Sequence, residues 1–502
     1  MSASPRARAA GLALAAFVAG ATNACSDDGG ASSGAPAPSL AWTPCNVDYE
    51  CATIQVPVDY AAPEGETIAL ALTRAPAAVP EERLGVIVVN PGGPGIPMVD
   101  QLARQYRAMK IAFPVALDRF DIVAFDWRGI GHSRPVECVD GAFFDRLRGL
   151  DLTLEDPASR SAVDEARRTL VAGCRARASD AVLSNLHTEN AARDLDRIRV
   201  ALGEEKLNYL GFSYGTVLGA TYATLYPDRV RAFALDSAIV LEGDLQGQLQ
   251  RRSEAFELGL TRFFDACARD NACAFHGGET ATAIASKLDA LVTRVRTTPG
   301  GLPAGARRLS IVDFHYAMAD GLRNGAPSKL AVDLAKAEAG DASALLARAD
   351  LVAGRRADAD YDSTIVGLVA IACLDQPFAP GTSIEGLHTF VHGLAPAPRS
   401  AGAIGIPFAL CVDWPWKRTV PARPIDARSA PPLLVVAGRN DPISSYAMAA
   451  PLLARLANGS HLVTYEGDGH SVSLRSACIR DAVTAFMLDP TKPPKAATCP
   501  AE

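Results

Sequence analysis

The chemistry of this chain is most clearly marked around Ser213, in the pentad Gly-Phe-Ser-Tyr-Gly at residues 211–215. A short apolar run that predicts a strand precedes the pentad, and small and apolar residues typical of a helix follow it. Between a strand and a helix, this pattern predicts a tight turn that lifts the serine hydroxyl clear of the sheet. Glycine is expected on both sides of the serine because such a turn leaves no room for side chains. We therefore interpret Ser213 as a candidate nucleophile.

A nucleophilic serine needs a histidine that takes its proton and an acid that orients the imidazole. Two downstream segments supply them in the order nucleophile, acid, histidine: Gly-Arg-Asn-Asp-Pro with Asp441, and Gly-Asp-Gly-His-Ser with His470. Each follows a predicted strand, and open α/β sheets place ligand chemistry at the carboxyl ends of their strands. Asp236, at the end of another predicted strand, is the alternative acid.

The turn Asn-Pro-Gly-Gly-Pro-Gly at residues 90–95 also follows a predicted strand. Its glycines would let a backbone amide approach the substrate oxygen on which negative charge develops. We expect one such oxyanion-binding amide from Gly93 and the second from Tyr214, the residue after the serine. The turn lacks the spacing of a dinucleotide-binding loop and the ending of a phosphate-binding loop.

The elements that must position these residues alternate between short β-branched runs and longer helical stretches, which is typical of a sheet with helices on its faces. Eight strands are predicted, at residues 53–59, 67–74, 86–90, 121–126, 207–212, 231–236, 433–437 and 462–466. Residues 245–425 carry mostly helical periodicity and predict an inserted cap, so that the core comprises residues 45–244 and 426–502. The segment after the fourth strand contains Arg128, which we expect to tie loops together beneath the site.

Composition limits the class of protein. The 502 residues are 49% hydrophobic and 21% charged, which suits a globular enzyme and excludes a disordered chain. The formal net charge is -7 and no basic run stands out, so nucleic acid is not an expected partner. His388 and His392 have helical spacing but lack the glutamate of a zinc-protease helix, so no metal and no cofactor is expected.

The N-terminus has the order of an export signal: Arg6 and Arg8, then an uncharged, small and apolar run, then Cys25. The run is shorter than the roughly 20 apolar residues that span a membrane. We interpret residues 1–24 as a cleaved signal peptide and residues 25–44, rich in Gly, Ser and Pro, as a flexible tether. Cys25 resembles the acylated cysteine of bacterial lipoproteins, although Thr22 stands where that motif usually has leucine. Membrane contact is expected only through such a lipid anchor.

Cysteine number agrees with export. If Cys25 is acylated or removed, ten of the 11 cysteines remain, an even number suited to disulfides. Pairing of sequence neighbours would join 45 with 51, 138 with 174, 267 with 273, 373 with 411 and 478 with 499. Buried free thiols are the alternative, because sequence alone does not determine connectivity.

The motifs taken together resemble those of secreted α/β-hydrolases of the tripeptidyl aminopeptidase and proline iminopeptidase group. They are NPGGPG, DWRGIGHSRPVEC, AARDLDRIRVALG, LNYLGFSYG, IACLDQP, GRNDP and GDGHS, in order over nearly all of the chain after the signal. The resemblance implies an α/β-hydrolase fold and an exopeptidase that releases tripeptides or single residues from free N-termini. It also implies the triad Ser213, Asp441 and His470. After NPGGPG the sequence departs from the group's small residues with Ile96, Pro97 and Met98, which puts substrate length in question.

An enzyme acting on free N-termini must recognise an ammonium group, for which carboxylates in a cap-lined pocket are suited. Asp375, Glu189 and Asp413 are candidates for that role, and surface acids in salt bridges are the alternative interpretation. Two other functions stay open: a carboxylic ester hydrolase with the same machinery, and a catalytically silent binding protein on the same fold. The sequence makes no prediction of oligomeric state.

Overall fold

The computed structural model describes residues 40–46, 48–151, 154, 157–278, 280–394, 399 and 408–502. The predicted signal peptide, Cys25 and most of the predicted tether lie outside these residues. Among the described helices, none combines the length and the hydropathy needed to span a bilayer.

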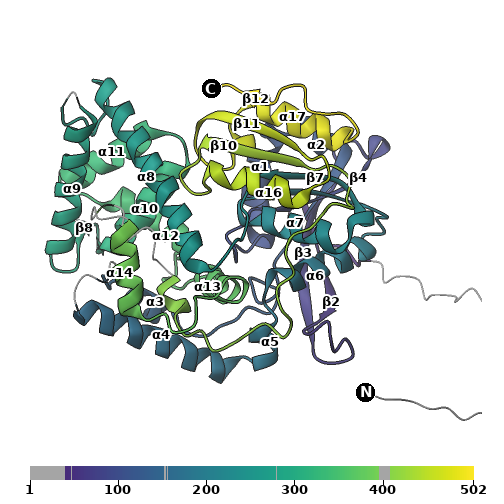
Figure 1. Cartoon of the computed structure of the whole chain (residues 1–502), viewed down its shortest axis with the longest axis horizontal. Helices are drawn as coiled ribbons and strands as arrows, with labels where there is room; N and C mark the ends of the chain where they lie inside the picture. Colours follow the sequence, from purple (N-terminus) through teal and green to yellow (C-terminus); the bar gives the residue numbers. More distant parts are fainter. Residues whose placement is uncertain are drawn as a thin grey trace, which may run out of the picture. The chain divides into compact units, whose positions relative to one another are not determined.

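The described chain contains a ten-stranded sheet, in the right half of Figure 1, with the order β1-β2-β3-β5-β4-β6-β7-β10-β11-β12. Its strands are β1 (Thr43–Asn46), β2 (Tyr49–Pro57), β3 (Thr67–Ala75), β4 (Gly85–Asn90), β5 (Phe120–Phe125), β6 (Leu207–Phe212), β7 (Val230–Asp236), β10 (Leu434–Asn440), β11 (His461–Asp468) and β12 (Thr498–Cys499). β1, β2, β3 and β5 pair antiparallel, whereas all neighbours from β5 to β12 pair parallel. The mostly parallel sheet is therefore confirmed.

All eight predicted strands are present, but the predicted number is too low. β1 and β12 extend the sheet at its two edges. They contain four and two residues, too few to show the alternation from which strands are predicted. A separate hairpin of β8 (Leu302–Ala304) and β9 (Arg307–Leu309) lies within the segment predicted to be mostly helical.

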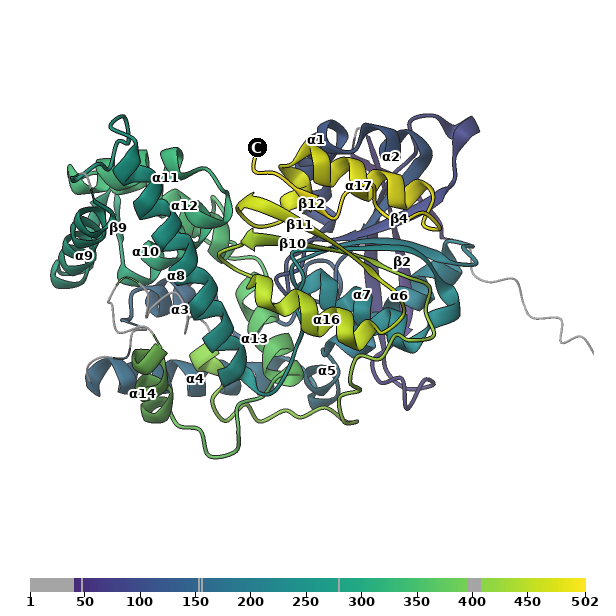
Figure 2. The same cartoon turned by 45° about the horizontal axis from the view of Figure 1, so that its top comes forward.

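Helices cover both faces of the sheet, because successive side chains of a strand point to opposite faces. In β4, Val86 and Val88 pack in one apolar cluster, and Ile87 and Val89 pack in the other. The first cluster is covered by α6 (Thr188–Ala201), α7 (Tyr214–Leu225) and α16 (Ala449–Leu456). The second is covered by α1 (Val99–Ala112), α2 (Pro114–Arg119) and α17 (Ala477–Leu488), on the opposite side in Figure 2.

Between β7 and β10 the chain forms a group of helices with its own apolar core, which lies beside the sheet in Figure 1. The helices that build this core are α8 (Leu245–Arg269), α9 (Ala281–Thr297), α10 (Ile311–Arg323), α11 (Pro327–Glu338) and α12 (Ser343–Ala353). The two later helices of the same stretch, α13 (Thr364–Asp375) and α14 (Ile384–Leu394), pack instead in the first cluster, with the sheet. An earlier segment forms α3 (Gly141–Arg148), α4 (Pro157–Arg177) and α5 (Asp180–Ser184), which also pack in the first cluster. Arg148 of α3 binds Asp313 of α10 and Asp350 of α12, each at 2.7 Å, so α3 is tied to the inserted helices.

Arg128 has the structural role expected of it. Its guanidinium is fully buried and pairs with Asp194 of α6 at 2.6 Å. It also donates to the carbonyl oxygens of Val58 and Asn185 at 2.7 and 3.1 Å. One side chain therefore joins three segments of the core, as predicted.

All five predicted disulfides are confirmed. The bonds are Cys45–Cys51, Cys138–Cys174, Cys267–Cys273, Cys373–Cys411 and Cys478–Cys499. Cys499 belongs to β12, so the last bond holds the C-terminal segment against α17.

Candidate active site

Ser213 occupies the turn between β6 and α7 and has backbone angles φ 53° and ψ -123°. A side chain at Gly211 would place its Cβ 2.6 Å from the carbonyl oxygen of Gly215, and one at Gly215 would lie 2.7 Å from that of Asn90. These distances are too short for any Cβ, so the crowding expected around the serine is present. The amide of Ser213 donates to the carbonyl of Asp236 at 2.9 Å, which anchors the strained turn to the neighbouring strand.

The loop at residues 90–95 packs directly on this turn. A Cβ at Gly92 would lie 2.6 Å from the amide nitrogen of Tyr214, so only glycine allows so close an approach. Gly93, Ser213 and Tyr214 line the same cavity. The structure therefore brings the two residues expected to supply oxyanion-binding amides to the candidate nucleophile.

His470 and Asp441 form a buried pair at the same edge of the sheet as Ser213. Nδ1 of His470 lies 2.8 Å from Oδ2 and 3.0 Å from Oδ1 of Asp441. The amide of His470 donates to the carbonyl of Arg323, the last residue of α10, at 2.9 Å. In the described chain no direct hydrogen bond joins Ser213 to His470, and such bonds are often long before substrate binds.

Asp441 is held by more than the histidine. The amides of Ile443 and Ser444 donate to Oδ1 at 2.8 and 3.0 Å, and the Ser444 hydroxyl donates to Oδ2 at 2.8 Å. Burial alone would raise the pKa of Asp441, but the charge of His470 and these hydrogen bonds hold it below its ordinary value. Asp441 is therefore a carboxylate that accepts from the imidazole. Sequence reasoning missed Ser444, which no motif marks.

The lowered pKa predicts how Asp441 affects stability. A carboxyl group whose pKa is lower in the folded state stabilises the fold above its unfolded pKa, about 3.9, and loses that effect as the pH falls through its folded value. Wild type should therefore exceed Asp441→Asn in melting temperature most clearly above about pH 4. The difference should shrink on further acidification. Thermal denaturation between pH 2.5 and 7 measures this, and a difference that grows towards acid would contradict it.

Asp236, the alternative acid, has a different set of partners. Its Oδ2 accepts from the amide of Ser473 at 2.8 Å and its Oδ1 from the amide of Val472 at 3.2 Å. Burial raises its pKa, against the effect of these bonds. Asp236 therefore supports the segment after His470 but does not hydrogen-bond to the imidazole, and the geometry favours Asp441 as the orienting acid.

The carboxylates expected to meet a substrate ammonium lie elsewhere. Asp375, with a side chain 3% exposed, accepts from the Thr188 amide at 3.0 Å and from the Tyr214 hydroxyl at 2.7 Å. Glu189, 6% exposed, pairs with Arg418 at 2.7 Å. Neither lines the cavity at Ser213.

The geometry thus does not support direct substrate contact by Asp375 or Glu189. Both carboxylates are used by buried donors of the protein, and Asp375 instead positions the ring of Tyr214. The third candidate, Asp413, is exposed. The burial of Asp375 and Glu189 depends on packing between α6, α13 and the segment around Arg418. A local sequence pattern therefore does not show whether such an acid is buried in a salt bridge or lines a substrate pocket.

The cavity at Ser213 has an empty volume of about 660 Å³, part of it open to solvent. Apolar side chains form most of its walls, from the loop after β4, the segment after β7, α8, α13, the short helix Phe408–Cys411 and the segment after Asp441: Pro94, Ile239, Leu241, Leu245, Leu249, Ala372, Phe408, Ile443 and Met448. Three polar side chains, Gln248, Arg252 and Gln376, complete the described lining. Gln376 stands in the motif IACLDQP, but no motif marks Gln248 or Arg252, for which periodicity predicted only that residues 245–425 are mostly helical.

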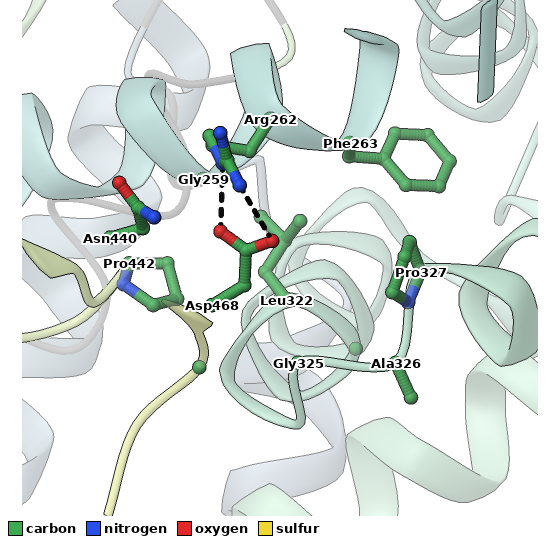
Figure 3. A pocket seen from close by; sticks show the side chains of 12 residues that line it. Gly259, Arg262, Phe263, Leu322, Gly325, Ala326, Pro327, Asn440, Pro442 and Asp468 are labelled. Atoms are coloured by element: carbon green, nitrogen blue, oxygen red, sulfur yellow. Dashed lines mark hydrogen bonds and ion pairs between the residues drawn. The ribbon is translucent and has the colours of Figure 1, made fainter. Parts of the chain in front are cut away.

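A smaller hollow lies behind the loops that carry Asp441 and His470 (Figure 3). There Arg262 of α8 pairs with Asp468 at 2.7 and 3.1 Å, and Pro442 contacts the same helix near Gly259. α8 therefore contacts the loop that carries Asp441 and the loop that carries His470.

Gly325, just after α10, also packs closely against the loop that carries His470. It has φ +59°, and a Cβ there would lie 2.7 Å from the carbonyl oxygen of Asp468, two residues before His470. We expect Gly325→Ala to displace the histidine loop, to lower stability by about 1–3 kcal/mol and to lower kcat more than it changes KM. Thermal denaturation and steady-state kinetics measure these effects.

Gly203→Ala is the matched control, because Gly203 also has positive φ but a Cβ there would meet no atom within 4 Å beyond its chain neighbours. It should lose stability with kcat unchanged. Equal losses of kcat in the two variants would show that Gly325 has no specific effect on the loop.

Among the described residues, no group of side chains at the site could hold a metal ion. His388 and His392 lie on α14 with ring centroids 4.4 Å apart. Within the described ranges, no three His, Cys, Asp or Glu side chains are grouped so that they could hold a metal ion.

Comparison with known proteins agrees with this fold. A model of the alpha/beta hydrolase fold matches residues 85–293, and a model of TAP-like proteins matches residues 401–499. The chain is 32% identical to Serine protease Hip1 of Mycobacterium tuberculosis, with 91% of this chain and 90% of that protein covered. It is 32% identical to Tripeptidyl aminopeptidase of Streptomyces lividans, with 91% and 86% covered. It is 33% identical to Carboxylesterase B of M. tuberculosis, with 97% and 95% covered.

The protein belongs to the α/β-hydrolase family, in the group that carries a TAP-like C-terminal region. It is an enzyme, a serine hydrolase, which sets aside the alternative of a catalytically silent binding protein.

Proposed function

We propose that this protein is an exported serine peptidase that releases tripeptides or single residues from free peptide N-termini through an acyl-enzyme. The observation that carries the proposal is the buried Asp441–His470 pair at the same sheet edge as the strained Ser213 turn. The names of the relatives, a serine protease and a tripeptidyl aminopeptidase, support a peptide substrate.

In the proposed mechanism, His470 accepts the proton of the Ser213 hydroxyl as the oxygen attacks the scissile carbonyl. Asp441 holds the imidazole with Nδ1–H towards its carboxylate, so that Nε2 is the basic nitrogen. The amides of Gly93 and Tyr214 stabilise the oxyanion that forms. His470 then returns the proton to the leaving amine. In the second half of the reaction His470 takes a proton from water as the water oxygen attacks the acyl carbonyl, and it gives that proton to the Ser213 oxygen when the acyl group leaves.

Export is supported by the five disulfides, because such bonds persist in oxidising compartments. We propose cleavage of residues 1–24 and acylation of Cys25, with residues 25–44 as a tether. Growth with a labelled fatty acid tests the anchor, and labelling that persists in Cys25→Ser would refute it. We also propose residues 45–244 and 426–502 as the catalytic core and residues 245–425 as the cap.

A carboxylic ester hydrolase is the second candidate, favoured by the similarity to Carboxylesterase B and by the largely apolar cavity. A panel of fluorogenic substrates separates the two. It comprises aminoacyl, dipeptidyl and tripeptidyl amides with free N-termini, their N-blocked forms, and short acyl esters. Cleavage of free but not blocked amides supports the aminopeptidase and gives its step length. Turnover of esters alone supports the esterase.

A further inference from the structure

The cavity at Ser213 contains one feature that serine hydrolysis does not require, the side chain of Arg252. This residue lies in the second turn of α8, next to Leu249 and Gln248 on the cavity wall. Of the described residues that line the cavity, Arg252 alone carries a charge.

Arg252 has no counter-ion in the described part of the chain. Its guanidinium instead faces the ring of Phe408, whose centroid lies 5.7 Å from the guanidinium carbon. Its neighbour Arg251 differs, because that guanidinium donates to the carbonyl oxygen of Glu242 at 2.9 Å. Burial lowers the pKa of Arg252, which is the effect expected of a charge that lacks a paired carboxylate.

An unpaired charge in a partly buried, apolar wall is unfavourable until a group of opposite charge arrives. A substrate carboxylate is the best partner for the Arg252 charge, since the planar guanidinium can donate two parallel hydrogen bonds to the two carboxylate oxygens. A lysine or arginine side chain in the same place would be repelled. The cavity should therefore discriminate by charge as well as by size.

The position of the cavity indicates which part of the substrate it receives. The leaving group must face His470, which protonates it, whereas the acyl group lies beside the oxyanion-binding amides. Gly93 and Tyr214 line the cavity, and His470 does not. The cavity therefore receives the acyl portion of the substrate.

We propose that Arg252 is a specificity-determining residue that binds the side-chain carboxylate of an aspartate or glutamate in the acyl portion of the substrate. The proposal rests on the proposed function, that Ser213 is acylated by a peptide. It adds an acidic preference that neither the triad nor the fold requires.

The test compares tripeptidyl amides that differ only in Glu, Gln or Lys at each of the three positions. At one position, wild type should cleave the Glu substrate about 10- to 100-fold better in kcat/KM than the Gln substrate, and Lys least well. Arg252→Met, which keeps an apolar stem, should remove this preference mainly through KM and leave the Gln substrates within about threefold.

Arg251→Met is the matched control and should keep the preference for Glu. Arg252→Lys, which keeps the charge but not the planar fork, should keep part of it. Labelling of Ser213 by a fluorophosphonate reports that each variant is folded. If Arg252→Met is not labelled and so is not folded, the preference for Glu over Gln is compared between Arg252→Lys and wild type instead. A preference that is equal in the two would overturn the inference.

The inference is overturned if wild type shows no preference for Glu at any position, or if Arg252→Met retains that preference. Failure of the peptidase proposal is distinguishable from this result. If only esters are cleaved, aryl hemiglutarate and aryl valerate replace the amides as the charged and neutral pair. A preference for hemiglutarate that Arg252→Met abolishes then supports the carboxylate site without a peptide substrate, and its absence refutes the site.

Discussion

Ser213→Ala is expected to lower kcat/KM by a factor on the order of 10⁵ to 10⁶, because no other group can form the acyl-enzyme at this turn. Fluorophosphonate labelling should disappear in the same variant. Folding should be unaffected, since alanine meets the same backbone strain at φ 53° and removes one hydroxyl that no described residue binds. Steady-state kinetics and thermal denaturation on the same preparation separate the two effects.

Ser445→Ala is a suitable control, because Ser445 lies close to Asp441 in sequence but only caps a short helical turn by accepting from the amide of Ala447. It should retain wild-type turnover and labelling. Labelling that persists in Ser213→Ala would place the nucleophile elsewhere and refute the proposed mechanism.

Asp441→Asn is expected to lower kcat by a factor on the order of 10⁴. The carboxylate accepts from Nδ1 of His470, so a neutral amide removes the charge that stabilises the imidazolium and can orient the wrong tautomer. The KM should change little, since Asp441 is buried and does not line the cavity. Measurement of kcat and KM on one substrate tests the expectation.

Asp236→Asn is the matched comparison, because Asp236 is an equally buried acid at the end of the strand next to β10. An amide there would place an N–H group against the amides of Val472 or Ser473, and the unsatisfied donors should cost about 1–3 kcal/mol of stability. The kcat should fall by no more than about tenfold. If instead Asp236→Asn loses 10⁴-fold and Asp441→Asn does not, the orienting acid is Asp236.

Features that depend on neighbours in the chain could be predicted from sequence. The turn at Ser213 is one, because Gly211 is required by contacts with Tyr209 and Gly215, within a few residues of it, although the clash that requires Gly215 comes from the distant Asn90. The five disulfides are another, since each joins cysteines that follow one another in sequence. The eight longer strands were found because their apolar, β-branched residues make a long enough pattern, whereas β1 and β12 were too short.

The tertiary structure alone decided how distant side chains pair. Asp236 and Asp441 both end strands, and only the packing of the loops after β10 and β11 shows that Asp441 contacts His470. Asp375 has the same sequence character as a pocket acid, yet α13 buries it against Tyr214. Arg252 belongs to no motif, and only the tertiary structure shows that it lines the same cavity as Ser213. The free energy of a charge depends on its surroundings in space, and those surroundings are assembled by contacts between residues far apart in sequence.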